Sequence, residues 1–227
     1  PNTKAVLVEA PGSQSFEMPD IPLIAEVAHA RGALVIDDNT WATPLFHRSL
    51  ELGVDISMQA ATKYIGGHSD IMFGTISANA KAWPMVTETI RLLGVCAGPD
   101  DVYLALRGTR TLAVRLAQHH RSGLEMARWL AARPEVARVL HPGLEIDPGH
   151  TIWKRDFTGA CGLFGVVLKP CSQKAVHAFL DALDLFGLGF SWGGYESLAI
   201  HCDPQLKNRT VPVNLEGPLL RLHVGLE

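Results

Sequence analysis

A lysine in a glycine-rich loop is the residue in this chain best suited to covalent chemistry. Lys63 lies in the segment Ala60–Asp70 (AATKYIGGHSD), beside the hydroxyl of Thr62 and after an apolar stretch. Lysine is seldom placed in such a setting for packing alone. A desolvated lysine, or one beside another cation, has a lowered pKa and can act as an amine nucleophile. Lys63 therefore suits Schiff-base chemistry, although a solvated loop lysine would show the same spacing.

Two adjacent carboxylates end another apolar stretch, in the segment Val35–Trp41 (VIDDNTW). A carboxylate beside a ring nitrogen keeps that nitrogen protonated, and a protonated pyridine is the better electron sink. An aspartate at such a position is also typical of a turn or a helix cap. The spacing alone does not choose between Asp37 and Asp38.

The elements that precede these residues predict a parallel sheet. Lys4–Ala10 and Ala33–Ile36 are apolar, β-branched runs of the length of buried strands. Between them, Asp20 has the features of a helix N-cap, Pro22 suits the first helical turn, and Gly32 suits the end of the helix. Strand, helix and strand within about 35 residues indicate a βαβ unit.

The next part of the chain continues this α/β pattern. Strands are predicted at Val54–Met58 and Ile71–Ala78, and helices at Thr43–Leu52, from Lys81, and over Asp100–Ala132. The candidate lysine and aspartates follow predicted strands. Ligands of open α/β sheets bind beyond the carboxyl ends of strands, which is the place expected for the chemistry.

A smaller α+β domain is expected in the last part of the chain. The pattern changes after Pro134, with one predicted helix at Ser172–Leu183. We place the domain boundary so that residues 1–109 and 110–227 form two domains. The predicted strands of the second are Val136–Leu140, Gly162–Leu168, Leu198–His201 and Leu219–Val224.

Composition argues for an ordinary globular protein. The 227 residues are 47% hydrophobic and 19% charged, with a net charge of -3, so neither disorder nor a polyanion partner is indicated. We expect no nucleic-acid partner, no membrane span and a cytoplasmic location. Four separated cysteines are expected to be free thiols.

Three other kinds of site are disfavoured. His68, Ser69 and Asp70 have the residue types of a hydrolytic triad, but a triad converges through the fold instead of standing in sequence. The ten histidines show no HExxH or Cys/His metal spacing. The glycines at 187, 189, 193 and 194 do not fit a dinucleotide-binding GxGxxG loop.

Several motifs in order resemble the cysteine/methionine-metabolism family of pyridoxal-phosphate (PLP) enzymes. VIDDNTW is followed by QAATKYIGGHSD (Gln59–Asp70), SWGGYESL (Ser191–Leu198) and RLHVGLE (Arg221–Glu227). The segment Ala105–His119 is similar to the family's long interdomain helix. The resemblance spans essentially the whole chain, and four motifs in register are far more specific than any one of them.

The resemblance implies a fold-type-I PLP enzyme, of which this chain is the C-terminal part of the large domain followed by the small domain. It implies that Lys63 is the Schiff-base lysine, that Asp38 pairs with the pyridine nitrogen, and that Thr62 binds the cofactor phosphate. Arg221 would bind the substrate α-carboxylate through two hydrogen bonds. Ser191 and Trp192 would line the active site near Lys63.

The chain departs from the family pattern in two respects. Many relatives have a serine three residues before the lysine, where this chain has Ala60. The family's chains also extend upstream of Pro1, with a phosphate loop, a tyrosine that stacks on the cofactor, and residues that reach the neighbouring subunit. The resemblance implies self-association as a homodimer or homotetramer.

Trp192 favours the carbon–sulfur β-lyase branch of the family. That branch is expected to cleave L-cystathionine to homocysteine, pyruvate and ammonia in methionine biosynthesis, and possible further substrates are cysteine and cystine. A γ-lyase, a γ-synthase or an O-acetylhomoserine sulfhydrylase of the same family is an alternative. A cofactor-binding or oligomerising remnant without turnover is an alternative of another class.

Overall fold

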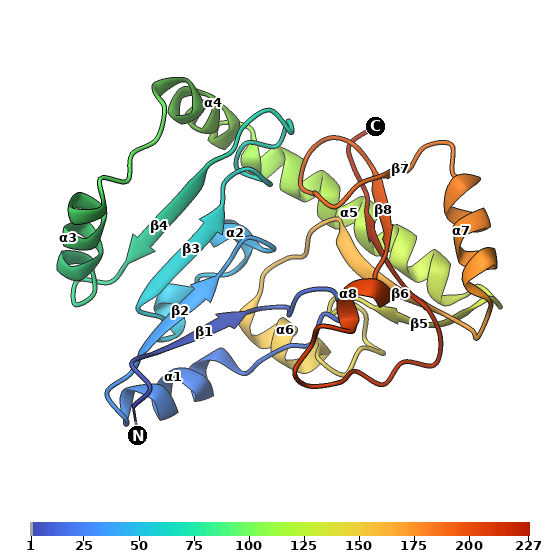
Figure 1. Cartoon of the computed structure of the whole chain (residues 1–227), viewed down its shortest axis with the longest axis horizontal. Helices are drawn as coiled ribbons and strands as arrows, with labels where there is room; N and C mark the ends of the chain where they lie inside the picture. Colours follow the sequence, from blue (N-terminus) through green and yellow to red (C-terminus); the bar gives the residue numbers. More distant parts are fainter. Residues whose placement is uncertain (1) are drawn as a thin grey trace.

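The computed structural model describes residues 2–227 and contains two β-sheets that lie side by side (Figure 1). The first sheet has the order β1-β2-β3-β4. β1, β2 and β3 are parallel, whereas β4 runs antiparallel to β3 because no crossover helix separates them. The mainly parallel sheet is confirmed. Its strands are β1 (Ala5–Glu9), β2 (Leu34–Asp38), β3 (Ile56–Ala60) and β4 (Gly74–Ala78).

The first helix follows the predicted signals. α1 (Ile21–His29) has Pro22 in its first turn, and its N-cap Asp20 accepts a hydrogen bond from the Leu23 amide at 3.2 Å. The helix ends before Gly32, which turns the chain towards β2 with a φ of +70°.

The helix predicted over Thr43–Leu52 is two shorter pieces, α2 (Thr43–Phe46) and the 3₁₀ helix η1 (Ser49–Leu52). His47 between them has an extended backbone. Its buried ring stacks on Phe157 with 4.0 Å between the ring centres. This long-range contact interrupts the helix.

The helical run predicted over Asp100–Ala132 is also divided. α4 (Pro99–Thr109) and α5 (Leu112–Ala131) meet at Thr111, which leaves helical geometry. Arg115 of α5 is buried and donates to the Gly108 carbonyl at the end of α4, so the break is stabilised by hydrogen bonds. α3 (Trp83–Leu93) precedes these helices, as predicted.

The second sheet has the order β5-β6-β9-β8-β7 and is antiparallel apart from the β7–β8 pair. Its core is formed where α5 and α7 pack on the sheet. Three of its elements, α6, β7 and α8, were not predicted from the sequence. The elements of this part are β5 (Val136–Leu140), α6 (His150–Asp156), β6 (Leu163–Leu168), α7 (Gln173–Asp181), β7 (Gly187–Leu188), β8 (Leu198–His201), α8 (Asp203–Leu206) and β9 (Leu219–His223).

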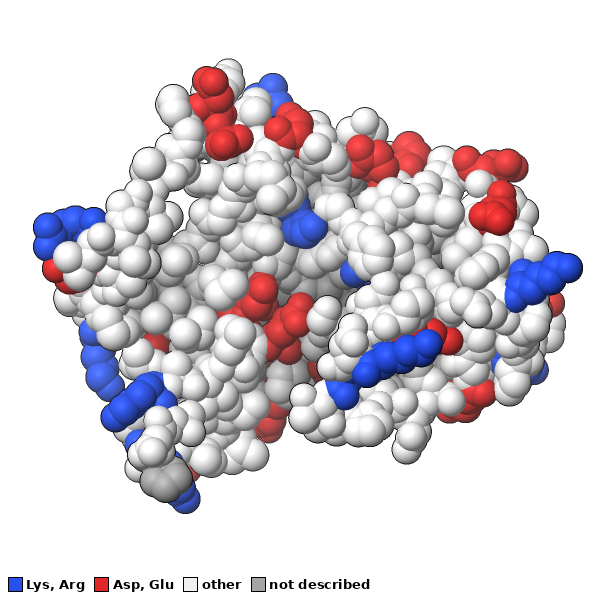
Figure 2. Space-filling model, viewed as in Figure 1, with Lys and Arg blue, Asp and Glu red and all other residues white. Residues whose placement is uncertain are grey.

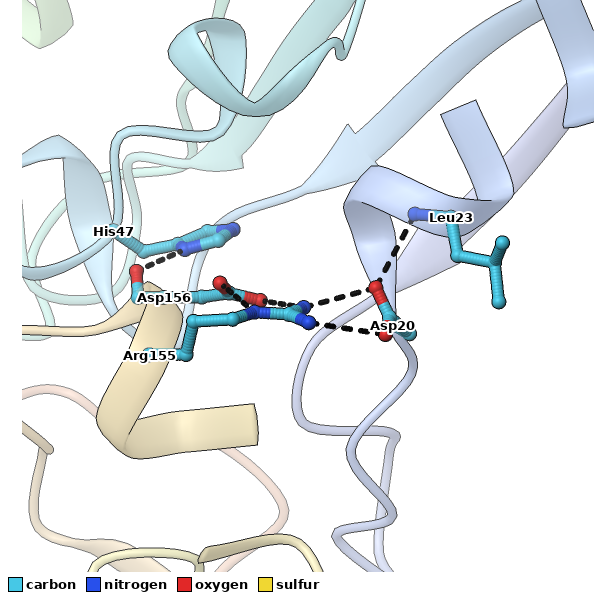
Figure 3. A network of polar contacts seen from close by, with 5 residues as sticks. All are labelled: Asp20, Leu23, His47, Arg155 and Asp156. Carbon is cyan, nitrogen blue, oxygen red and sulfur yellow. Dashed lines mark hydrogen bonds and ion pairs between the residues drawn. The ribbon is translucent and has the colours of Figure 1, made fainter. Parts of the chain in front are cut away.

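Polar contacts join the two halves of the chain. Arg155 of α6 binds both oxygens of Asp20 at 3.1 and 2.9 Å, and it also pairs with Asp156 (Figure 3). The indole N–H of Trp41 donates to the Leu163 carbonyl at 2.9 Å. One hydrophobic core also contains residues from both halves. The boundary at residues 109 and 110 stays a prediction.

No helix within residues 2–227 is long and apolar enough to cross a membrane. The four thiols are unpaired, with Cys96 and Cys171 exposed and Cys161 and Cys202 buried.

We predict that Asp20→Ala lowers the free energy of unfolding by about 1 kcal/mol, because α1 loses its N-cap. Asp20→Asn keeps a capping oxygen and should lose only a few tenths, since the ion pair with Arg155 is largely exposed. Urea unfolding of the two variants measures the difference. An equal loss in both would show that the ion pair, and not the cap, stabilises this corner.

Candidate active site

The turn after β3 presents Lys63. The Lys63 amide donates to the Ala60 carbonyl at 2.9 Å, and the Gly67 amide donates to the Lys63 carbonyl at 2.7 Å. Arg115 of α5 donates to the Tyr64 carbonyl at 2.6 Å. These bonds fix the backbone on both sides of the lysine, so its side chain starts from a rigid turn.

The amine of Lys63 meets two residues of the segment that precedes β8. Its Nζ donates to the Ser191 hydroxyl at 2.8 Å and lies 5.4 Å from the centre of the Trp192 ring. Burial, and then the nearby Arg221 cation, lower the pKa of Lys63. The neutral, nucleophilic amine is therefore more accessible than in a solvated lysine.

Arg221 of β9 is a buried cation that pairs with no carboxylate in the part of the chain that the structure describes. The residue is 8% exposed, and one of its guanidinium nitrogens donates to the Phe190 carbonyl. No carboxylate of residues 2–227 forms an ion pair with it. Burial lowers the pKa of Arg221. A buried, unpaired guanidinium suits an anionic ligand such as a carboxylate.

Asp38 at the end of β2 is held by one oxygen. Its Oδ1 accepts from the amide of Thr40 at 3.0 Å and from the Thr40 hydroxyl, while Oδ2 accepts no hydrogen bond from the described residues. The Thr40 hydroxyl also accepts from the Ala60 amide at 2.8 Å, which ties Asp38 to the start of the Lys63 turn. Burial, and then Asp38, raise the pKa of the neighbouring Glu9 to about 7. One oxygen of Asp38 is thus anchored and the other is available.

Asp37 lies on the opposite face of β2, because successive side chains of a strand alternate. Its carboxylate is fully buried, and neither oxygen has a hydrogen-bond partner among residues 2–227. Its Oδ2 is 3.8 Å from His47 Nε2. Burial is the main cause that raises the pKa of Asp37 to about 7, and burial also lowers the pKa of His47. This placement favours Asp38, the residue that the resemblance implies, over Asp37 for the role beside a ring nitrogen.

Thr62 lies beside Lys63, but its hydroxyl is engaged with the backbone of Phe73. It donates to the Phe73 carbonyl at 3.3 Å and accepts from the Phe73 amide at 3.0 Å. To donate to a phosphate, the hydroxyl must give up the Phe73 carbonyl. The role expected for Thr62 stays a prediction.

The structure therefore brings Lys63, Ser191, Trp192 and Arg221 together and links Asp38 to them through Thr40. Figure 2 shows a hollow near the middle of the face that it draws, with basic and acidic side chains on the walls of the hollow. Thr40 was not singled out from the sequence. The turn in which an aspartate bonds a backbone group two residues on was a signal for it.

Comparisons with known proteins identify the family. The sequence profile of the "Cys/Met metabolism PLP-dependent enzyme" family matches residues 1–227. The chain belongs to this family. A protein of Rhizobium johnstonii is 54% identical over 231 residues, and the cystathionine beta-lyase of Escherichia coli is 46% identical over 233 residues. The alignments include all of this chain but only 58% and 59% of the two relatives. The chain therefore spans less than two thirds of their length.

A solved structure agrees with the fold. The cystathionine gamma synthase of Xanthomonas oryzae pv. oryzae, in complex with cystathionine, superimposes with a TM-score of 0.90 at 33% identity. The match covers 99% of this chain and 59% of the other. The expected α/β fold of a PLP-dependent enzyme is confirmed, and so is PLP as the cofactor of the family.

The residues of the site fit PLP. Lys63 offers an amine with a lowered pKa, Asp38 offers a free carboxylate oxygen, and Arg221 offers an unpaired cation for a bound anion. PLP carries an aldehyde, a ring nitrogen and a phosphate, and its substrates carry a carboxylate. The donor set matches these groups in kind.

We predict that Asp37→Asn stabilises the protein relative to the wild type, and that this gain is larger at pH 8 than at pH 5. The raised pKa means that a protonated Asp37 favours folding fully below about 3.8 and that this contribution is lost as the pH rises to about 7. Asparagine mimics the neutral acid at every pH, so its advantage over the wild type should grow over this range. The gain is at most a few kcal/mol, since one pKa unit corresponds to about 1.4 kcal/mol.

Urea unfolding at the two pH values measures this difference, with Asp184→Asn as a control at an exposed aspartate. A loss of stability in Asp37→Asn that is the same at both pH values would contradict the prediction. It would show that Asp37 and His47 form a charged pair.

Proposed function

We propose that the complete protein is a PLP-dependent carbon–sulfur β-lyase that cleaves L-cystathionine to homocysteine, pyruvate and ammonia. The observation that carries the proposal is the Lys63 amine, 2.8 Å from the Ser191 hydroxyl, in a site that also contains the unpaired Arg221. The named activity of the E. coli relative, 46% identical, supports the substrate. Cysteine and cystine are further substrates of the same reaction type.

When bound, PLP supplies the electron sink for the reaction. Lys63 would hold the cofactor, remove the Cα proton of the substrate, and return a proton to the departing sulfur. A general base of this kind contributes about 10²- to 10⁴-fold to the rate. Its lowered pKa increases the fraction of neutral amine near physiological pH.

The other side chains of the site would orient the reactants. Arg221 would bind the α-carboxylate, and its burial makes the two-pronged contact strong. Asp38 would keep the ring nitrogen protonated through its free oxygen. Thr62 would bind the phosphate, while Ser191 and Trp192 would keep the Lys63 amine in place between proton transfers.

A γ-acting enzyme is the second candidate, because the solved structure with a TM-score of 0.90 is a cystathionine gamma synthase. A remnant without turnover is a candidate of another class for a chain that spans 58% of a relative. Lys63-dependent chemistry separates a remnant from an enzyme, and the products separate β- from γ-elimination.

Self-association is part of the proposal. α4 exposes a group of apolar side chains, and large exposed apolar patches are typical of protein interfaces. Tyr103 is 64% exposed and Leu106 is 57% exposed. We propose that a homodimer or homotetramer covers this face.

We predict that PLP becomes attached to Lys63. Incubation with PLP followed by sodium borohydride should leave a pyridoxyl group on the peptide that contains Lys63, detected by mass spectrometry. Lys63→Ala should lose the adduct, whereas Lys81→Ala, at an exposed lysine, should keep it. If a chain extended to the length of the relatives forms no such adduct, the proposed function is wrong.

We predict that the complete protein releases pyruvate from L-cystathionine, because β-elimination breaks the carbon–sulfur bond on the three-carbon side. Liquid chromatography with mass spectrometry distinguishes pyruvate from 2-oxobutyrate. A product mixture dominated by 2-oxobutyrate would assign the protein to γ-elimination.

A further inference from the structure

The segment from Phe190 to Glu196 positions Ser191 and Trp192 although it contains no helix or strand. Such a segment needs tertiary contacts to adopt one conformation. Strand β9 supplies them from two alternate residues. Arg221 donates to the carbonyl of Phe190, at one end of the segment, and His223 binds further along it.

His223 binds the segment at two backbone groups. The Gly193 amide donates to His223 Nε2 at 3.0 Å, and His223 Nδ1 lies 3.0 Å from the Glu196 carbonyl. A backbone N–H can only donate and a carbonyl can only accept. His223 must therefore be neutral, with its proton on Nδ1. Burial lowers the pKa of His223 to about 3, which agrees with this form.

The residue that His223 holds is packed directly on Lys63. Gly193 has a φ of +80°, and a Cβ at this position would lie 2.8 Å from Lys63 Cβ and 3.0 Å from Lys63 Cα. Only glycine fits this approach without a shift of the backbone. The bond from Gly193 to His223 thus fixes the segment at its contact with the lysine.

The His223 ring is held in turn by its surroundings. The residue is 1% exposed, and its ring centre is 5.9 Å from that of Tyr64 and 5.2 Å from that of His119. His119 is equally buried, but it binds the Val224 carbonyl and makes no hydrogen bond to the segment within residues 2–227. The two neighbouring histidines therefore form a natural comparison.

We propose that His223 is a positioning residue, whose two backbone hydrogen bonds hold the segment Phe190–Glu196, and with it the Ser191 hydroxyl, against Lys63. The importance of this geometry for catalysis rests on the proposed function. The contacts themselves do not depend on it.

Hydrogen–deuterium exchange of His223→Phe tests the proposal, with His119→Phe as the matched control. Phenylalanine keeps a buried ring of similar size and removes both nitrogens. We expect the amides of residues 190–196 to exchange about tenfold faster or more, because the hydrogen bond from the Gly193 amide to a buried acceptor is lost. Residues 60–67, which Gly193 covers, should also exchange faster, and His119→Phe should change neither segment.

Two conservative variants separate the role from general stability. In His223→Gln, the side-chain oxygen can occupy the place of Nε2 and accept from Gly193. In His223→Asn, the side-chain amide can occupy the place of Nδ1 and donate to Glu196 only. Glutamine should restore protection at Gly193 better than asparagine, with similar thermal unfolding temperatures for both.

The rate of borohydride-trapped PLP attachment to Lys63 in the complete protein is the second readout. We expect His223→Phe to slow it severalfold and His223→Gln to recover much of the rate. Unchanged exchange in residues 190–196, or faster exchange with an unchanged rate of attachment, would overturn the proposal. If the wild type forms no adduct, the proposed function fails, and the exchange data alone decide whether His223 holds the segment against Lys63.

Discussion

Two positive side chains, Lys63 and Arg221, share one partly buried site. No carboxylate of the described chain forms an ion pair with Arg221. Burial lowers the pKa of both Lys63 and Arg221, and the charge of Arg221 further favours the neutral form of Lys63. An unpaired buried cation is costly unless a ligand supplies the opposite charge. The site is therefore built for an anion, which is what an amino-acid substrate of a PLP enzyme offers.

The scaffold meets this constraint with separate elements that fix each group from a different side. β3 and the first part of α5 fix the turn of Lys63, the latter through the bond from Arg115 to the Tyr64 carbonyl. β9 carries Arg221 and also holds the segment that bears Ser191. Thr40 connects the end of β2 to the end of β3, so Asp38 keeps its place relative to the lysine turn. Both sheets contribute, which explains why contacts such as Trp41 to Leu163 join them.

Much of this arrangement could be predicted from local sequence. The βαβ unit, the cap at Asp20 and the strand Val136–Leu140 depend on periodicity and capping, and they appear as predicted. The break at His47 could not be predicted, because it depends on Phe157 in a distant part of the chain. The break at Thr111 could not be predicted either, because the side chain of nearby Arg115 is held there by the distant turn of Lys63, through the Tyr64 carbonyl. The short α6, β7 and α8 carry too little local pattern, and the antiparallel direction of the predicted strand β4 is seen only in its pairing with β3.

The site shows the same division. Lys63 stands out by its residue type and glycine-rich setting. Spacing alone does not choose between Asp37 and Asp38; the resemblance to the family implies Asp38, and the two faces of β2 favour the same residue. His223 lies within a motif of the sequence, yet its role depends on Gly193, which is 30 residues away in the chain.

The pKa of the Lys63 amine, in the wild type and in Arg221→Met, tests the central claim most directly. It can be measured from the pH dependence of Lys63 acetylation, followed by mass spectrometry. The account predicts a wild-type pKa below the ordinary 10.5, and a rise towards it when the charge of Arg221 is removed. An ordinary pKa in the wild type, or no change in Arg221→Met, would contradict the claim that the two cations share one site.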